Sequence, residues 1–277
     1  MSELENEIRQ VLENAGRFLQ QQRDLFGEIL YAGGSEQKAE ENAHIVKAKS
    51  QLHQPEEIDL FGAPAPSGIP ILKSPIHAQQ QYPGEPWVTA TTVDDLNSRI
   101  CTCLKCPLGK TRTNFVFGVG NPHADVVVVG EAPGADEDAQ GEPFVGRAGQ
   151  LLNKILDAIQ FKREEVFICN ILKCRPPNNR DPLPEEIDLC EPYLWKQLEI
   201  IKPKMILCLG RIAGQSLLKT NDTLTSLRGK FFDYRGISLM VTYHPAALLR
   251  NPNWKKPAWE DVQLFRKKYD EMKSTSH

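Results

Sequence analysis

Long apolar runs are missing from this 277-residue sequence. No segment approaches the roughly 18 consecutive apolar residues that a membrane-spanning helix needs, and the mean hydropathy is −0.40. The start of the chain is acidic and lacks the basic segment and apolar segment of a secretory signal. We therefore expect a soluble, cytoplasmic protein without a membrane anchor.

The sequence also lacks an even set of cysteines, because it has seven. An odd number fits poorly with a fully disulfide-bonded secreted protein, and clustered cysteines in a reducing compartment more often serve metal or redox chemistry. Cys103 and Cys106 form a Cys-x2-Cys pair, and Cys174 and Cys190 complete a set of four. Four thiolates can hold zinc or an iron–sulfur cluster, so the spacing leaves the metal open.

Charge is distributed unevenly, although the formal total is only −3. Residues 1–96 carry eight more acidic than basic side chains, whereas residues 97–277 carry five more basic than acidic ones. An amphipathic helical pattern over residues 1–31 gives way to a stretch rich in proline and glutamine. We expect an N-terminal helix over 1–31, a disordered linker over 32–96 and a globular domain over 97–277.

Four apolar runs in that domain predict strands buried on both faces, at residues 125–130, 166–170, 205–210 and 238–242, and the first of them is a continuous series of β-branched valines. Helical patterns separate these runs. We therefore expect an α/β fold with three layers, αβα, around a central, mainly parallel, four-stranded sheet. In such sheets ligands bind beyond the carboxyl ends of the strands, so the loops that follow the four runs are the places to look for function.

The first of these loops has the sequence GEAPG at 130–134, followed by three acidic residues at 136–138. It lacks the lysine of a P-loop and the Gly-x-Gly-x-x-Gly of a dinucleotide site. Asn170 ends the second run, and its carboxamide could read a base edge or could simply form a turn. His244 follows the fourth run and by itself would more often be structural. The expected convergence of Glu131, Asn170 and His244 at one sheet edge favours a functional site.

Together these motifs resemble the family 4 uracil-DNA glycosylases, the bacterial and archaeal branch that carries an iron–sulfur cluster. The resemblance covers roughly residues 97–270. It rests on six segments in the same order: Cys-x2-Cys-Pro-Leu at 103–108, Arg-Thr-Asn at 112–114, GEAPG at 130–134, PFVGRAGQLL at 143–152, KCRPPNNRDP at 173–182 and HPAALLR at 244–250.

The resemblance implies a hydrolase that removes uracil from DNA and leaves an abasic site, the first step of base excision repair. It implies a structural [4Fe-4S] cluster on Cys103, Cys106, Cys174 and Cys190. No lysine is placed to form a Schiff base, so we expect a monofunctional enzyme. Uracil-containing DNA would be the partner of a monomeric, nucleoid-associated protein.

The same resemblance assigns the base pocket. A uracil flipped out of the stack would lie against Phe144. Asn170 would bind O4 and N3–H of the base, and His244 would donate to O2, where negative charge develops as the bond breaks. These three side chains, with Glu131 and Ala132, form the expected uracil site.

The sequence does not identify the residue that activates the attacking water. Ala132 occupies the turn position that carries an aspartate in the better-known family 1 enzymes, so a carboxylate must come from elsewhere. Glu131 is the first candidate. Glu137 follows it, and Asn178 could help to position the water.

DNA contacts are implied for the loops around this pocket. Arg175, Arg180 and Arg250 would lie near phosphates, and Leu248 or Leu249 would enter the gap left by the flipped nucleotide.

The N-terminal part of the sequence contains two segments that could bind a protein partner. The segment from Gln22 to Phe26 (QRDLF) resembles the pentapeptide by which bacterial repair proteins bind the sliding clamp, and the segment from Glu57 to Phe61 repeats its Asp-Leu-Phe. The alternative is that Leu25 and Phe26 belong to the apolar face of the helix.

Two other functions fit parts of the pattern. A non-catalytic iron–sulfur module that binds DNA or assists a polymerase could keep the fold, but it would not need Glu131, Phe144, Asn170 and His244 together. An enzyme that uses the glycine-rich loop for a small phosphorylated substrate would leave the four-cysteine set without a purpose. The set of retained side chains favours the glycosylase.

Overall fold

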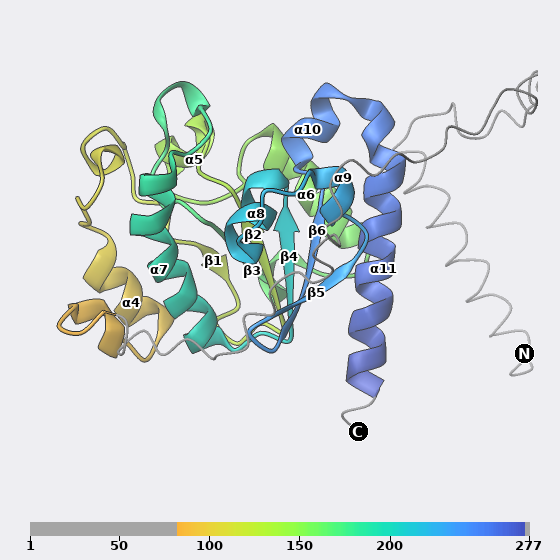
Figure 1. Cartoon of the computed structure of the whole chain (residues 1–277), viewed down its shortest axis with the longest axis horizontal. Helices are drawn as coiled ribbons and strands as arrows, with labels where there is room; N and C mark the ends of the chain where they lie inside the picture. Colours follow the sequence, from red (N-terminus) through yellow and green to blue (C-terminus); the bar gives the residue numbers. More distant parts are fainter. Residues whose placement is uncertain (1–81, 275–277) are drawn as a thin grey trace, which may run out of the picture. The chain divides into compact units, whose positions relative to one another are not determined.

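The computed structural model describes residues 82–274 (Figure 1). The helix predicted for residues 1–31, both clamp-like segments and most of the predicted linker lie outside these residues. None of the described helices is long and apolar enough to cross a membrane.

The ordered domain begins earlier than the predicted boundary at residue 97. The 3-10 turn η2 (Pro86–Thr89) and the start of helix α4 (Val93–Ile100) lie inside the predicted linker. Trp87 and Val88 are only 3% and 4% exposed and belong to the main core, so this part of the predicted linker is folded. The proline-rich composition of the segment had suggested disorder. The Trp87 ring packs edge-on against Tyr193, with 5.3 Å between ring centroids.

The sheet has six strands in the order β1-β3-β2-β4-β6-β5. The strands are β1 (Val119–Gly120), β2 (Val126–Gly130), β3 (Phe167–Asn170), β4 (Met205–Leu209), β5 (Phe231–Tyr234) and β6 (Ile237–Thr242). The four central strands are parallel, as predicted, and each is paired with its neighbours in register. The antiparallel edge strands β1 and β5 were not predicted, because one has two residues and the other is only partly buried.

Helices cover both faces of this sheet, which confirms the three-layer α/β fold (Figure 1). The remaining helices are α5 (Ala135–Gln140), α6 (Arg147–Ala158), α7 (Pro184–Ile201), α8 (Arg211–Leu218), α9 (Leu224–Leu227), α10 (Pro245–Arg250) and α11 (Lys255–Ser274). Short 3-10 turns are η3 (Pro107–Lys110), η4 (Arg163–Glu165), η5 (Pro177–Asn179) and η6 (Pro252–Trp254).

Alternate residues of the central strands feed two hydrophobic cores. Val126 and Val128 of β2 pack in one core with residues of α6 and α11, and Val127 and Val129 pack in the other with residues of α4, α7 and α8. Figure 1 shows α7 and α4 on one side of the sheet and α11 on the other. Because β2 is buried on both faces, its sequence is a continuous apolar run rather than an alternating one.

Candidate active site

A cavity of about 440 Å³ lies at the carboxyl ends of the parallel strands. Its lining includes Glu131 after β2, Asn170 at the end of β3, Arg211 after β4 and His244 after β6. The four side chains meet because parallel strands end at the same edge of the sheet. Ala132, Glu137, Phe144 and Arg250 also line the cavity.

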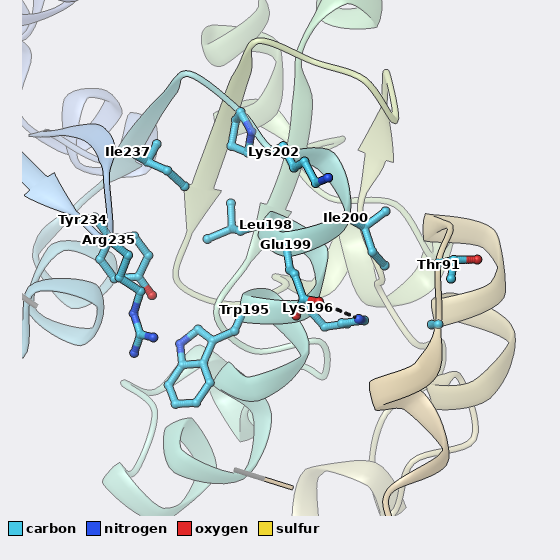
Figure 2. A pocket seen from close by; sticks show the side chains of 12 residues that line it. Thr91, Trp195, Lys196, Leu198, Glu199, Ile200, Lys202, Tyr234, Arg235 and Ile237 are labelled. Atoms are coloured by element: carbon cyan, nitrogen blue, oxygen red, sulfur yellow. Dashed lines mark hydrogen bonds and ion pairs between the residues drawn. The ribbon is translucent and has the colours of Figure 1, made fainter. Parts of the chain in front are cut away.

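A second cavity, of about 650 Å³, is larger but holds none of the side chains singled out by the sequence. It lies near the end of α7 and the turn between β5 and β6, away from the carboxyl ends of the strands (Figure 2). The Arg235 guanidinium lies 5.2 Å from the ring centroid of Trp195, and Lys196 pairs with Glu199 at 3.0 Å. The smaller cavity is therefore the candidate active site.

Asn170 is the most buried polar side chain of that site, with 1% of its surface exposed. Its Oδ1 is fully buried and accepts no hydrogen bond from any residue between 82 and 274. A Cβ added to Gly130 would collide with this oxygen and would come within 2.6 Å of the Phe144 ring, so only glycine fits at the end of β2. A buried acceptor without a donor costs roughly 1–3 kcal/mol, which a ligand N–H could recover.

Phe144 and His244 form an aromatic wall beside the amide. Their ring centroids are 5.5 Å apart, with an angle of 32° between the ring planes. Phe144 has a φ of 54°, a left-handed conformation that is unusual for an aromatic residue. Helix α6 packs so closely beneath it that a Cβ on Gly149 would overlap the Phe144 carbonyl group. The backbone therefore fixes the ring beside the cavity.

His244 is neutral at physiological pH. Burial, with a smaller effect of Arg250, lowers its pKa to about 4. Its Nδ1 accepts a hydrogen bond of 3.1 Å from the backbone N–H of Ala246, at the start of α10. The ring proton must then reside on Nε2, so the imidazole can offer a neutral N–H donor. The histidine thus caps a helix and retains a donor for a ligand.

The Glu131 carboxyl is an unusually weak acid. Burial raises its pKa to about 7, nearby Asp181 adds to this, and Arg211 opposes it. Asp181 and Arg211 form an ion pair at 2.9 Å and both line the cavity. A carboxyl that titrates near neutral pH in a cavity is suited to acid–base chemistry.

Glu137 has a different environment. Its Oε1 accepts hydrogen bonds of 3.0 Å from the N–H groups of Val145 and Gly146, and its Oε2 accepts one of 3.1 Å from Gly134. Both carboxylate oxygens are thus engaged by backbone donors from two loops. The contacts favour a role in holding the loop that carries Phe144.

Asn178 is not part of the cavity lining, whereas its neighbour Asn179 is. Both residues have a φ of 54°, and the Oδ1 of Asn179 accepts a hydrogen bond of 2.7 Å from Arg175 Nε. The sequence could not separate two adjacent asparagines in one loop. Asp181 and Arg211 were also missed as lining residues, because neither stands out in a charged, exposed segment.

The expected DNA contacts are only partly exposed. Leu249 is 46% exposed, but Leu248 is 2% exposed and packs into the protein, so Leu248 is not available to enter DNA. The prediction for Leu248 was wrong because α10 turns this residue inward. Arg250 is exposed and lines the cavity. Arg180 makes two hydrogen bonds to the Glu186 carboxylate, at 2.9 and 2.6 Å, which hold it at the start of α7.

The four candidate metal ligands lie in one region, where hydrogen-bond donors point at three of their sulfurs. Arg112 Nη1 is 3.2 Å from Cys174 Sγ, the Tyr193 hydroxyl is 3.2 Å from Cys103 Sγ, and the backbone N–H of Lys173 is 3.3 Å from Cys190 Sγ. Such donors are typical of sulfurs that bear negative charge in metal centres.

Burial and mutual proximity also affect the acidity of these cysteines. Burial raises the pKa of Cys190 to about 12 and raises that of Cys174, so these sulfurs need strong positive charge to become thiolates. Cys103 and Cys106 are near enough to raise the pKa of Cys174 further. Across the described part of the chain, no three His, Cys, Asp or Glu side chains converge closely enough to hold a single ion.

Comparison with known proteins adds a family match. Residues 117–263 match the model of the Uracil DNA glycosylase superfamily. The chain is similar to the Type-4 uracil-DNA glycosylase of Archaeoglobus fulgidus, with 49% identity over 180 residues, which are 62% of this chain and 90% of that protein. The Type-4 uracil-DNA glycosylase of Thermotoga maritima is 46% identical over 158 residues, 56% of this chain and 82% of that protein. The DNA polymerase of Bacillus phage SP01 is 29% identical over 149 residues, 53% of this chain but 16% of the polymerase.

Proposed function

The chain belongs to the uracil-DNA glycosylase superfamily, and we propose that it removes uracil from DNA by hydrolysing the N-glycosidic bond. The product is an abasic site, the first intermediate of base excision repair. The observation that carries this proposal is the amide oxygen of Asn170, which accepts no hydrogen bond from residues 82–274 and is buried beside Phe144 and a neutral histidine in one cavity.

Uracil fits the polar groups of this cavity. Its N3–H would donate to the Asn170 oxygen that lacks a partner, and its O4 would accept from the same carboxamide. Cytosine carries an acceptor at N3 and a donor at N4, so it presents the opposite pattern to this amide. The flat face of the base would lie on the Phe144 ring, as in other enzymes that flip bases out of DNA.

Bond cleavage leaves negative charge on the departing base. The Nε2–H of neutral His244 would donate to uracil O2, where that charge collects. A donor of this kind, fixed in place before the reaction, is worth about 3 kcal/mol of the barrier. Because His244 carries no charge at neutral pH, it would stabilise the anion as a neutral hydrogen-bond donor.

We assign to Glu131 the roles of orienting the attacking water and stabilising the positive charge that develops on the sugar. Its pKa of about 7 makes the ionised form abundant at slightly alkaline pH. Glu137 holds the surrounding loops through its three backbone contacts, and Asn179 rather than Asn178 reaches the cavity. The mechanism needs no covalent intermediate, so the enzyme is monofunctional.

Cys103, Cys106, Cys174 and Cys190 would hold a [4Fe-4S] cluster. When bound, the cluster supplies a rigid crosslink rather than a step of the reaction. It would tie the segment before β1 to the loop after β3, which carries Arg175 and Asn179.

Partners and location complete the proposal. Arg250 and the exposed Leu249 would contact DNA next to the cavity, and a monomer in the cytoplasm, associated with the nucleoid, would meet its substrate there. The segments from Gln22 to Phe26 and from Glu57 to Phe61 would bind a sliding clamp. A pull-down of the full chain with purified clamp, lost on Phe26→Ala with Phe61→Ala, tests that contact.

The polymerase match favours one second candidate, a non-catalytic domain that assists a polymerase. Incubation of the cluster-loaded protein with a uracil-containing oligonucleotide, followed by alkali, separates the two. Strand scission at the uracil position is the result we expect. Intact strands after treatment with brown, folded protein would reject the glycosylase and leave the accessory domain.

A further inference from the structure

Lys173 is a fully buried lysine between the base-reading residue and the cysteine set. It precedes Cys174 in the loop after β3, and its relative exposure is 0%. Its ammonium donates to the backbone carbonyl of Asn170 at 2.8 Å and to Oε1 of Gln197 at 2.6 Å. Both acceptors are uncharged, so these bonds orient the ammonium without neutralising it.

No carboxylate among residues 82–274 forms an ion pair with Lys173. Burial lowers the pKa of Lys173, because a buried unit charge without a counter-charge is very costly in a protein interior. The nearby groups that can carry negative charge are sulfurs, those of Cys169, Cys174 and Cys190. Two of these belong to the proposed cluster set, so the counter-charge of the ammonium would be the thiolate-ligated cluster itself.

The backbone and side chain of Lys173 also join three separate parts of the fold. Its N–H donates to Cys190 Sγ in α7, and its carbonyl accepts a hydrogen bond of 2.9 Å from Val116, just before β1. Its partner Gln197 continues the chain of contacts, since Gln197 Nε2 donates to the Phe117 carbonyl at 3.0 Å. The network ends at the Asn170 carbonyl, on the residue whose amide faces uracil.

We propose that Lys173 is a positioning residue that couples the iron–sulfur cluster to uracil recognition. Its charge balances the cluster on one side, and its hydrogen bond fixes the backbone of Asn170 on the other. This inference rests on the proposed function and cofactor. It predicts that one side chain influences both the reduction potential of the cluster and the preference for uracil.

Arg112 provides a matched control. It also donates to a cluster ligand, Cys174, but the backbone carbonyls that it binds are those of Cys101 and Cys103 rather than that of Asn170. Loss of the Arg112 charge should therefore change the reduction potential without changing uracil preference.

The experiment uses the full, cluster-loaded chain with Lys173→Met, Lys173→Arg and Arg112→Met. The readouts are iron content, the reduction potential, and binding to an oligonucleotide with one 2′-fluoro-deoxyuridine, which resists cleavage, against the same strand with deoxycytidine, whose N3 and N4 present the opposite pattern to Asn170. Removal of a positive charge makes adding an electron harder, so Lys173→Met and Arg112→Met should both lower the potential. Lys173→Met should also weaken the preference for the uracil strand by about tenfold, the effect of one lost hydrogen bond. Lys173→Arg should restore part of both properties, and Arg112→Met should leave the preference intact.

Two results would overturn the inference: an unchanged potential in Lys173→Met, or an unchanged uracil preference in that variant with full iron content. Should Lys173→Met fail to fold, Gln197→Met keeps the charge and removes one acceptor. It should weaken uracil preference and shift the potential less than Arg112→Met does, and an unchanged preference there refutes the coupling. A wild-type protein that cleaves no uracil would reject the proposed function, whereas the potentials would still test the role of the charge.

Discussion

Glu131 allows the sharpest prediction, because the cavity disfavours its ionised form while the proposed reaction needs that form. Burial raises its pKa from 4.5 to about 7. Since the folded pKa lies above the unfolded one, the folded protein binds the extra proton between these values. Stability from this group is therefore greatest at low pH and falls as the pH rises from about 4.5 towards 7. Activity should move in the opposite direction, increasing as the carboxyl ionises.

The magnitude follows from the two pKa values. The difference corresponds to about 3 kcal/mol by which the folded protein disfavours the charged carboxyl, an upper limit for a partly solvated group. Glu131→Gln removes that charge and keeps the size of the side chain. For a domain of this length about 2–4 °C in Tm accompanies each kcal/mol. The variant should thus match the wild type at pH 4.5 and exceed it by up to about 10 °C at pH 8.5.

The assay combines thermal unfolding at the two pH values with single-turnover excision from a uracil oligonucleotide. Wild-type rates should rise about tenfold per pH unit below 7 and level off above it, whereas Glu131→Gln should be at least about a hundredfold slower and lack this rise. Glu164→Gln, which changes an exposed carboxyl, is the control for both measurements. A rise of rate with pH that persists in Glu131→Gln would assign the titration to another group. Equal Tm differences at pH 4.5 and 8.5 would show that the cavity does not penalise the charge.

Four further substitutions test the other side chains in and around the site. His244→Gln should slow excision about a hundredfold, from the roughly 3 kcal/mol of a fixed donor, with little change in binding of uncleaved substrate in a filter-binding assay. Asn170→Ala should raise KM for the uracil oligonucleotide and abolish discrimination against cytosine, measured by competition. Leu248→Ala should lower the free energy of unfolding by about 2–4 kcal/mol in urea. Leu249→Ala should leave stability unchanged and slow excision from duplex more than from single-stranded DNA, and equal effects of the two leucine variants on stability would contradict their different exposure.

The sequence predicts the strands of the fold that are buried on both faces of the sheet. Val126–Gly130 and the other central strands are mainly apolar because helices cover both faces of the sheet. A continuous apolar run of this kind can be recognised in the sequence. The edge strand β5 contains Asp233 and exposes part of its surface, so its sequence has no such pattern. The segment around Trp87 was assigned to the linker because its order comes from contacts with α7, which are far away in the chain.

The site was predictable as a group of side chains but not in its details. The order of strand ends placed Glu131, Asn170 and His244 together, because parallel strands share an edge. The choice between Leu248 and Leu249, or between Asn178 and Asn179, depends on how a short helix or turn is rotated about its axis. That rotation is set by packing: Leu248 faces the core and Asn179 is held by Arg175. Adjacent residues of the same type carry no sequence signal for it.

Three features of this cavity lower the stability of the unliganded protein, and the bound substrate would compensate for all three. Phe144 adopts a left-handed φ, and the amide oxygen of Asn170 has no donor in the described part of the chain. Burial of Glu131 disfavours its charged form. Each would destabilise a protein that had no ligand to bind. A uracil base would supply the missing donor to Asn170 and cover the Phe144 ring. A cationic sugar would favour the charged form of Glu131. The energy that the empty cavity loses is therefore recovered mainly in the complex, and the Glu131 part of it only as the bond breaks, which is the condition for lowering a barrier rather than merely binding a substrate.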